Sequence, residues 1–181
     1  MMRTPLRILG LTALAAALII VFYPPLRGLL GFYYRLFRAK RLSDQFYANF
    51  PCVSKNIRYL PSSPLTLDVY QPESGSGYPV VFYVYGGSWN SGNKELYAPA
   101  AQRLLPEGVV MVVPNYTRYP AAGYPSQTQE IAAALAWTLD NIASYGGDPG
   151  RIIVAAQSAG AQIAGLAVYD PRWLAASEDG R

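Results

Sequence analysis

From Val53 onward, short β-rich apolar runs alternate with longer stretches whose apolar residues recur at helical spacing. The runs that predict strands are VSKNIRYL and LTLDVYQP around a PSSP turn, then PVVFYVY, VVMVVP and RIIVAA. The stretches that predict helices are residues 94–108, ending at Gly108, residues 126–145, and residues 159–168. Strands that alternate with helices predict an α/β fold with a mostly parallel sheet covered on both faces.

The second of these helices has the clearest signals for its ends and its buried side. Ser126 and Gln129 have the spacing of a capping box, and Gly146-Gly147 follows the last turn. Its apolar stripe consists of Ile131, Leu135, Leu139 and Ile142. We therefore expect this stripe to face the core.

The N-terminus carries an uncharged apolar run from Ile8 to Tyr23, with arginines on both sides. The run is slightly short for a membrane span. Ala15–Ala17 resembles the small-residue cleavage site of a secretory signal, but the apolar run continues beyond it. We expect residues 1–25 to be a membrane anchor, with the side of the membrane left open. Secretion through a cleaved signal is the alternative.

Residues 26–52 follow as a basic amphipathic segment beside the expected anchor. Its apolar residues at helical spacing are Leu26, Leu29, Leu30, Tyr33 and Phe37. Arginines and aromatic residues at the margins are typical of a helix that lies in the membrane interface or re-enters it. The alternative is an ordinary surface helix packed on the domain that spans residues 53–181.

Composition and charge narrow the classes of function. The chain of 181 residues is 51% hydrophobic, which fits a folded protein with one main domain. Most of the excess positive charge lies near the N-terminus, in Arg3, Arg7, Arg27, Arg35, Arg38, Lys40 and Arg41. The rest is close to neutral, so we do not expect nucleic-acid binding. With no histidine and one cysteine, Cys52, an ordinary zinc site is excluded, and we expect no metal or other cofactor.

One serine stands between a predicted strand and a predicted helix, in the stretch IIVAAQSAGAQIAG. A tight turn there lifts the Ser158 hydroxyl clear of the sheet, and the helix that starts at Ala159 directs free N–H groups to the same place. An attacking oxygen would thus lie beside an anion-binding site. The alternative is a serine that only caps the helix.

A glycine loop, YGGSW, directly follows the predicted strand PVVFYV. Gly86 and Gly87 can adopt backbone conformations closed to other residues, so their N–H groups can complete an oxyanion hole with that of Ala159. The alternative is a plain turn after a strand. We reject a phosphate-binding loop in GSWNSGNK, because its lysine comes one residue late and Glu95 stands at the magnesium-binding position.

From about Leu65 to Val168 the chain resembles the N-terminal half of an α/β-hydrolase of the group related to hormone-sensitive lipase. That group includes prenylcysteine methylesterase-like and feruloyl-esterase-like carboxylesterases. The matching segments are LTLDVYQP, VVFYVYGGSWNSG, VVMVVPNYTRYP, IASYGGDPGRI and AAQSAGAQIAG. The resemblance implies a serine hydrolase that acts on a small-molecule ester.

The resemblance also implies roles for individual residues. Ser158 becomes the nucleophile, and Gly86, Gly87 and Ala159 become the oxyanion-hole donors. Trp89 becomes a wall of the acyl or alcohol pocket, and Tyr85, at the head of the glycine loop, is expected beside it at the substrate site. Asp148 and Arg151 are expected to brace the loop that enters the nucleophile strand.

Three features depart from the family pattern. Tyr85 replaces the histidine that usually positions the glycine loop, and a tyrosine can bond there through its hydroxyl. Ala156 replaces the first glycine of G-x-S-x-G, a small change at the turn. The family's acid and histidine follow the serine at later strands, but this chain has no histidine, and Asp170 and Asp179 lie too near the serine helix.

A serine hydroxyl needs a base to take its proton, and neither Tyr85 nor Lys94 is a good substitute for imidazole. We therefore expect the chain to be the N-terminal part of an esterase that is inactive by itself, with the acid and base encoded beyond Arg181. The alternative is a non-catalytic, membrane-tethered binding protein on a hydrolase scaffold. The oligomeric state is left open.

Overall fold

The computed structural model of the chain describes residues 23–174. Contacts divide the chain into two units that meet between Leu42 and Ser43. The expected anchor or signal lies outside the described residues, except for its last residues. Within residues 23–174, no helix has both the length and the apolar character that a membrane crossing requires.

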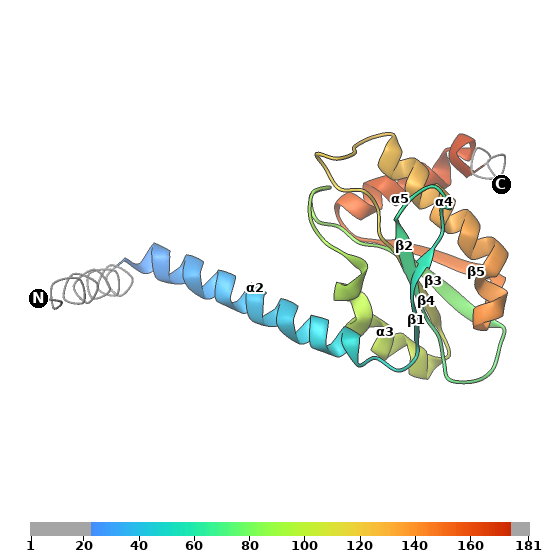
Figure 1. The fold of residues 1–181 in the computed structure, drawn as a ribbon, viewed down its shortest axis with the longest axis horizontal. Coiled ribbons are helices and arrows are strands. Elements are labelled where there is room, and N and C mark those ends of the chain that lie inside the picture. The colour runs from blue at the N-terminus through green and yellow to red at the C-terminus, as the bar shows by residue number, and fades with distance from the viewer. Residues whose placement is uncertain (1–22, 175–181) are drawn as a thin grey trace, which may run out of the picture. The chain divides into compact units, whose positions relative to one another are not determined.

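A five-stranded sheet forms the centre of the second unit, with the strand order β1-β2-β4-β3-β5 (Figure 1). The strands are β1 (Val53–Arg58), β2 (Thr66–Tyr70), β3 (Tyr78–Val84), β4 (Val110–Pro114) and β5 (Gly147–Ala156). Each predicted strand is present, and β5 begins four residues before the predicted RIIVAA run. Every residue of β4 is buried, because β4 lies between two other strands and is covered on both faces.

The sheet is mixed: β1, β4, β3 and β5 run in one direction, as the prediction of a mostly parallel sheet has it, and β2 runs opposite to them. β3 pairs parallel to β4 and to β5, with Phe82 opposite Val112 and Val154. β2 pairs antiparallel to both β1 and β4. The short turn between β1 and β2 is the physical reason for the first antiparallel pair, since a parallel connection needs a crossover of a dozen or more residues.

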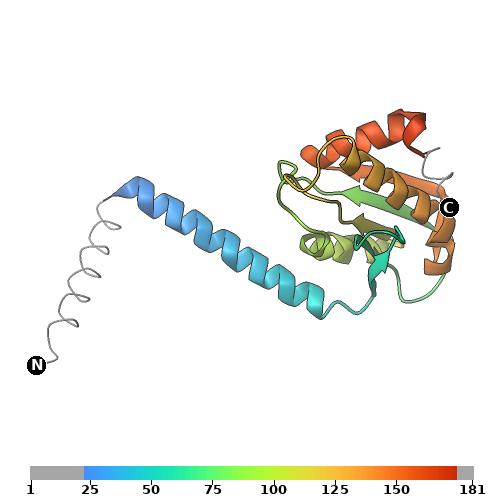
Figure 2. The same ribbon diagram turned by 45° about the horizontal axis from the view of Figure 1, so that its top comes forward.

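Helices cover both faces of this sheet, with α4 and α5 together on one face and α3 on the other (Figures 1 and 2). The helical elements are α2 (Pro24–Ala48), η1 (Lys94–Tyr97), α3 (Ala98–Leu104), η2 (Leu105–Glu107), α4 (Ser126–Asn141), η3 (Ile142–Tyr145) and α5 (Ala159–Tyr169). The predicted helix 94–108 is thus three short pieces. Pro99 and Pro106 each stand near the start of a piece, where a missing N–H is tolerated. Gly108 ends the last piece with φ 67°, as predicted.

Two details of the α4 prediction were wrong. The helix is preceded by Pro125 without a side-chain capping bond, so Ser126 and Gln129 form no capping box; the Gln129 N–H donates to the Pro125 carbonyl instead. Ile131, Leu135 and Ile142 are buried, but Leu139 is 42% exposed. Alanines take part of the buried face, because small side chains let α4 lie close to α5 and the sheet.

The core of the second unit joins the sheet to the last turns of α2, through Phe46 and Tyr47. The edge of the sheet formed by β5 is less covered by other elements. β5 is the last strand in the described sheet, and Ile153 is 61% exposed there. The turn that follows β5 carries Ser158.

Candidate active site

Ser158 occupies a strained turn between β5 and α5. Its backbone has φ 52° and ψ −125°, a conformation that residues with a side chain rarely adopt. The side chain is exposed and makes no capping hydrogen bond to α5, although Ser158 stands at the N-cap position. The structure therefore does not support the capping interpretation, and it leaves the hydroxyl at the surface.

The glycine loop lies directly against this serine. A β-carbon on Gly86 would be 2.6 Å from the Gln157 carbonyl oxygen and 2.9 Å from the β-carbon of Ser158. On the other side, a β-carbon on Gly160 would collide with the carbonyl oxygens of Val84 and Tyr85. Any larger residue at either glycine would thus force the end of β3 away from the serine turn.

The end of β3 and the start of α5 place two of the predicted oxyanion-hole residues, Gly86 and Ala159, next to Ser158. The Gln157 N–H donates to the Val84 carbonyl at 3.2 Å, which fixes the serine turn on β3. Ala159 is the first residue of α5, a position whose N–H has no partner within a helix. Gly86 and Ala159 therefore flank Ser158 from two different elements, and Gly87 follows in the same loop.

After Gly86 the loop turns back on itself through a series of left-handed residues. Gly87 has φ 136°, and Ser88 and Trp89 have φ 50° and 61°. The Gly87 carbonyl accepts hydrogen bonds from the Ser91 N–H at 3.0 Å and the Ser91 hydroxyl at 2.8 Å. A β-carbon on Gly87 would overlap the Ser91 carbonyl, so only glycine fits this position.

Trp89 connects the loop to two neighbouring elements. Its indole Nε1 donates to the Gln162 side-chain oxygen on α5 at 3.1 Å. Its carbonyl accepts the Tyr119 N–H at 2.8 Å and the Gln127 amide at 3.3 Å. The indole is 43% exposed. Trp89, the predicted pocket wall, is thus held beside α5 with part of its indole exposed.

Tyr85 is buried in the core, where its hydroxyl donates to the Asn115 side-chain oxygen at 2.8 Å. That oxygen also accepts the Lys94 N–H at 2.9 Å, and the Tyr116 hydroxyl donates to the Tyr85 carbonyl at 3.1 Å. The Tyr85 and Tyr116 rings stack with their centroids 4.8 Å apart. The expectation that a tyrosine at the loop head bonds through its hydroxyl is therefore confirmed.

The tyrosines near the serine turn remain protonated at neutral pH. Burial raises the pKa of the Tyr85 phenol above its usual value. Burial also raises the pKa of Tyr97 to about 12, and the Tyr97 and Tyr83 hydroxyls reach the Gln157 side chain at 3.4 and 3.5 Å. None of these phenols is suited to take the serine proton.

Lys94 is committed to a buried ion pair. Its ammonium lies 2.8 Å from an Asp68 carboxylate oxygen, with both side chains fully buried, and 3.0 Å from Glu95. Asn56 accepts a further hydrogen bond from the ammonium at 2.8 Å. This placement excludes Lys94 as a base for Ser158 and as a phosphate ligand in a nucleotide-binding loop.

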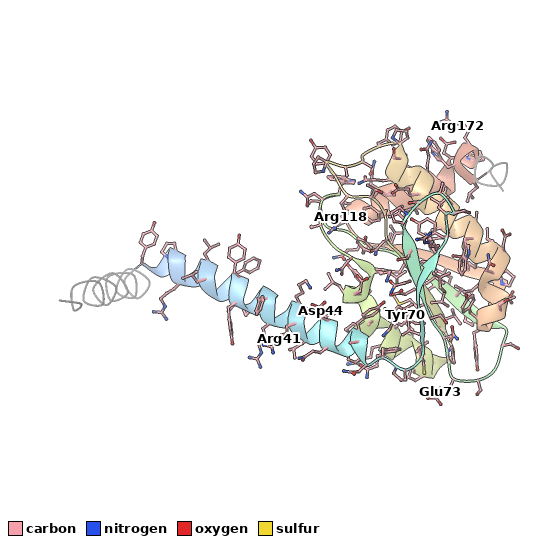
Figure 3. The ribbon with its side chains drawn as sticks, viewed as in Figure 1. Arg41, Asp44, Tyr70, Glu73, Arg118 and Arg172 are labelled. Carbon is pink, nitrogen blue, oxygen red and sulfur yellow. The ribbon has the colours of Figure 1, made fainter. Side chains whose placement is uncertain are left out.

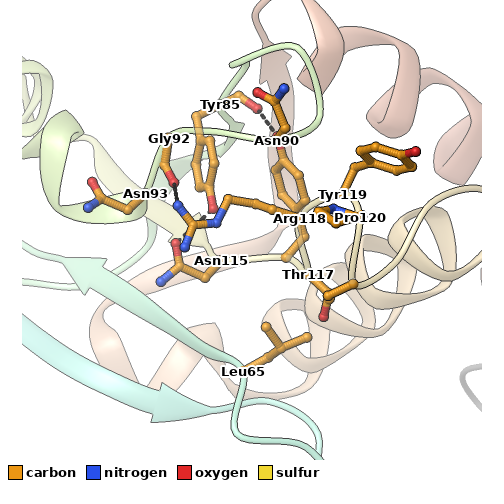
Figure 4. A pocket seen from close by; sticks show the side chains of 12 residues that line it. Leu65, Tyr85, Asn90, Gly92, Asn93, Asn115, Thr117, Arg118, Tyr119 and Pro120 are labelled. Carbon is orange, nitrogen blue, oxygen red and sulfur yellow. Dashed lines mark hydrogen bonds between the residues drawn. The ribbon is translucent and has the colours of Figure 1, made fainter.

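A pocket of about 610 Å³ lies between the glycine loop and the segment that follows β4 (Figure 4). Its lining residues are Leu65, Tyr85, Asn90, Gly92, Asn93, Asn115, Tyr116, Thr117, Arg118, Tyr119, Pro120 and Ala121. Arg118 reaches across it and donates to the Gly92 carbonyl at 3.3 Å. Tyr85 therefore lines this cavity, whereas Ser158 and Trp89 are not among its lining residues.

Two of the remaining acidic candidates, Asp148 and Asp170, have structural partners. Asp148 accepts the Gly150 N–H at 2.8 Å and Arg151 donates to the Gly77 carbonyl at 3.2 Å, which confirms that they brace the start of β5. Asp170 pairs with Arg172, and Asp179 lies outside the described residues. No cluster of metal-ligating side chains is found between residues 23 and 174.

The sequence patterns did not single out Asn115 and Gln162 as partners of the glycine loop. Both belong to long-range contacts, since Asn115 follows β4 and Gln162 lies on α5. Asn115 stands directly after a buried strand, at the edge of the sheet where the glycine loop also starts. That position is the one signal in the sequence that could have singled it out.

Comparison with known proteins gives a consistent result. The BD-FAE family model matches residues 67–172. A probable isoprenylcysteine α-carbonyl methylesterase of Oryza sativa is 36% identical over 113 residues, which are 62% of this chain and 27% of the relative. The esterase LipQ of Mycobacterium tuberculosis is 39% identical over 90 residues, which are 49% of this chain and 21% of the relative.

Solved structures agree on the fold. Esterase B of Lactobacillus rhamnosis superposes with a TM-score of 0.62 at 23% identity, over 77% of this chain and 48% of the esterase. A hyperthermophilic esterase of Pyrobaculum calidifontis gives a TM-score of 0.60 at 28% identity, over 74% of this chain and 47% of the esterase. The chain thus spans about half of these solved esterases and about a quarter of the curated relatives.

Proposed function

The chain belongs to the BD-FAE family of α/β-hydrolases, and from this premise we propose that it carries the nucleophile and oxyanion hole of a serine carboxylic-ester hydrolase. One observation carries the proposal: Ser158 keeps an unusual backbone conformation while its hydroxyl is exposed and not used as a helix cap. Strain of this kind persists where a function requires it. The contact between Gly86 and Ser158 supports the same reading.

In this reaction the Ser158 hydroxyl oxygen bonds to the carbonyl carbon of the ester and loses its proton to a base. The carbonyl oxygen becomes an oxyanion, and the N–H groups of Gly86, Gly87 and Ala159 are the proposed donors that stabilise it. Collapse of the intermediate releases the alcohol and leaves an acyl group on Ser158, which water then removes. Each donor of this kind contributes about 2.7 to 4 kcal/mol to the transition state.

These residues provide no base that could take the Ser158 proton. The chain has no histidine, and Lys94 is paired with Asp68. The phenols of Tyr85 and Tyr97 hold their protons at neutral pH, because burial raises the pKa of each. We expect the acid and the base to come from outside these residues and the chain alone to turn over no ester.

The substrate is a small-molecule carboxylic ester. Trp89 is the proposed wall beside the serine, because its half-exposed indole is held on the serine helix by Gln162. The pocket lined by Tyr85 and Tyr119 is the proposed space for the acyl or alcohol part.

Turnover of p-nitrophenyl butyrate by the purified full chain tests this proposal, with Ser158→Ala as the comparison. We expect no difference between the two proteins. A clear loss of hydrolysis in Ser158→Ala would show that the chain has its own base and would overturn the claim of inactivity.

The absence of histidine also favours a second candidate, a non-catalytic membrane-tethered binding protein. In both cases we propose that residues 8–23 attach the chain to a membrane, on the basis of their apolar sequence between arginines. The candidates differ at Ser158, which accepts an acyl group only in the first.

A further inference from the structure

The first part of α2 has two opposite faces. At about 100° per residue, Arg27, Arg35 and Arg38 fall within an arc of about 80°, which we call the arginine face. The aromatic face lies in the opposite arc of about 200°, into which Lys40 and Arg41 also fall after its last apolar residue. It consists of Leu29, Leu30, Phe32, Tyr33, Tyr34 and Phe37.

The aromatic face is open to solvent. Its six side chains are between 44% and 65% exposed. Figure 3 shows side chains that stand out from the ribbon along α2. The side chains of α2 that pack on the hydrophobic core come later, at Phe46 and Tyr47. An exposed surface with this many large apolar side chains is typical of an interaction site.

The charged residues next to the aromatic face are all basic. From Arg27 to Arg41 the helix contains five basic residues and no acidic residue, and its first acid is Asp44. Cations that flank an apolar helix face complement the negative headgroups of anionic lipids. Tyrosine rings suit the same boundary, since one end is apolar and the other hydrogen-bonds with water or headgroups.

We propose that α2 binds the surface of an anionic lipid bilayer through residues 24–42. The aromatic face enters the boundary between headgroups and acyl chains, and the arginine face remains at the level of the phosphates. A spanning orientation does not fit, because α2 is not apolar enough to cross a membrane. A coiled coil does not fit either, because its apolar seam is narrower than this arc.

The test uses the full chain with a single reporter thiol. Cys52→Ser removes the only native cysteine, and Tyr33→Cys then places an environment-sensitive fluorophore on the aromatic face. The matched control is Arg35→Cys, two residues along on the arginine face. Each labelled protein is mixed with vesicles of phosphatidylcholine alone or with about 30 mol% phosphatidylglycerol, an amount that gives a clear negative surface potential.

The proposal predicts a blue shift and protection from an aqueous quencher at position 33, with anionic vesicles, and little change at position 35. The readout is local, so it reports on α2 even where other segments also bind lipid. In a chain with Arg27→Gln, Arg38→Gln and Arg41→Gln, the apparent affinity at position 33 should fall on the order of 100-fold at low salt. High salt should weaken the unchanged protein in the same direction.

Several results would overturn the proposal. An equal shift with neutral and anionic vesicles would show that charge does not select the lipid. Equal protection at positions 33 and 35 would show a helix that is buried all round. A shift without lipid that grows with protein concentration would show a second copy of the chain on the aromatic face, and no shift under any condition would show that lipid does not bind there.

Discussion

Gly86 and Ser158 are in direct contact, so close that a β-carbon on Gly86 would lie 2.9 Å from that of Ser158. The two residues are far apart in the sequence, and each lies two residues after the end of one of the neighbouring parallel strands β3 and β5. Because parallel strands end at the same edge of a sheet, the register of β3 and β5 brings the glycine loop to the serine. The candidate site therefore depends on the sheet rather than on either motif alone.

Gly86→Ala should disturb this contact. The new methyl group would meet the Gln157 carbonyl at 2.6 Å, so we expect a loss of about 1 to 3 kcal/mol in the free energy of unfolding. Chemical denaturation measures the change. Gly165→Ala is the control, because its β-carbon would meet nothing within 4 Å and should stabilise α5 by up to about 1 kcal/mol. Equal effects of the two substitutions would contradict the close contact.

The backbone strain at Ser158 can be measured separately. Glycine adopts a positive φ without the steric cost, so Ser158→Gly should be more stable than Ser158→Ala by about 1 kcal/mol. Ser126→Gly is the matched control, since Ser126 has a helical backbone and glycine should destabilise α4 there by about 0.5 to 1 kcal/mol. A Ser158→Gly protein no more stable than Ser158→Ala would argue against a strained turn.

Removal of the Asn115 side chain should reduce the stability of the protein more than removal of the Tyr85 hydroxyl that it binds. Tyr85→Phe removes one hydrogen bond and should cost about 1 kcal/mol, because the Asn115 oxygen still accepts the Lys94 N–H. Asn115→Ala removes the acceptor of both donors and should cost about 2 to 4 kcal/mol. Thermal or urea denaturation of the two variants compares them. A Tyr85→Phe protein that is the less stable of the two would contradict this network.

Lys94→Met tests the buried ion pair. It leaves the Asp68 carboxylate buried without its cation, and should cost about 3 to 5 kcal/mol in the free energy of unfolding. Adding Asp68→Asn removes the charge and retains an acceptor for the Asn56 N–H, so the double variant should recover part of that loss. A single variant that loses less than about 1 kcal/mol would show that the pair is not buried as described.

The sequence predicted the strands, the serine turn and the glycine loop, because each has a local pattern. It did not predict the antiparallel pairing of β2 with β4, which depends on strand order rather than on periodicity. The ion pair between Lys94 and Asp68 was not predicted for the same reason, since β2 and η1 come together only in the folded protein. The prediction of a capping box at Ser126 was wrong because Pro125 precedes α4 and a backbone hydrogen bond from Gln129 to Pro125 closes its first turn.

The central claim is that the fold holds Ser158 in the position of a nucleophile and that only a base is lacking. Imidazole added with p-nitrophenyl butyrate supplies that base, and peptide mass mapping of the full chain then locates the butyryl group. The matched control is Ser144, which is also exposed but lies in η3.

We expect the adduct on Ser158 to exceed that on every other serine, to persist in Ser144→Ala, to fall in Gly86→Ala and to be absent in Ser158→Ala. A Ser158 that takes no more butyryl group than Ser144 would contradict the claim.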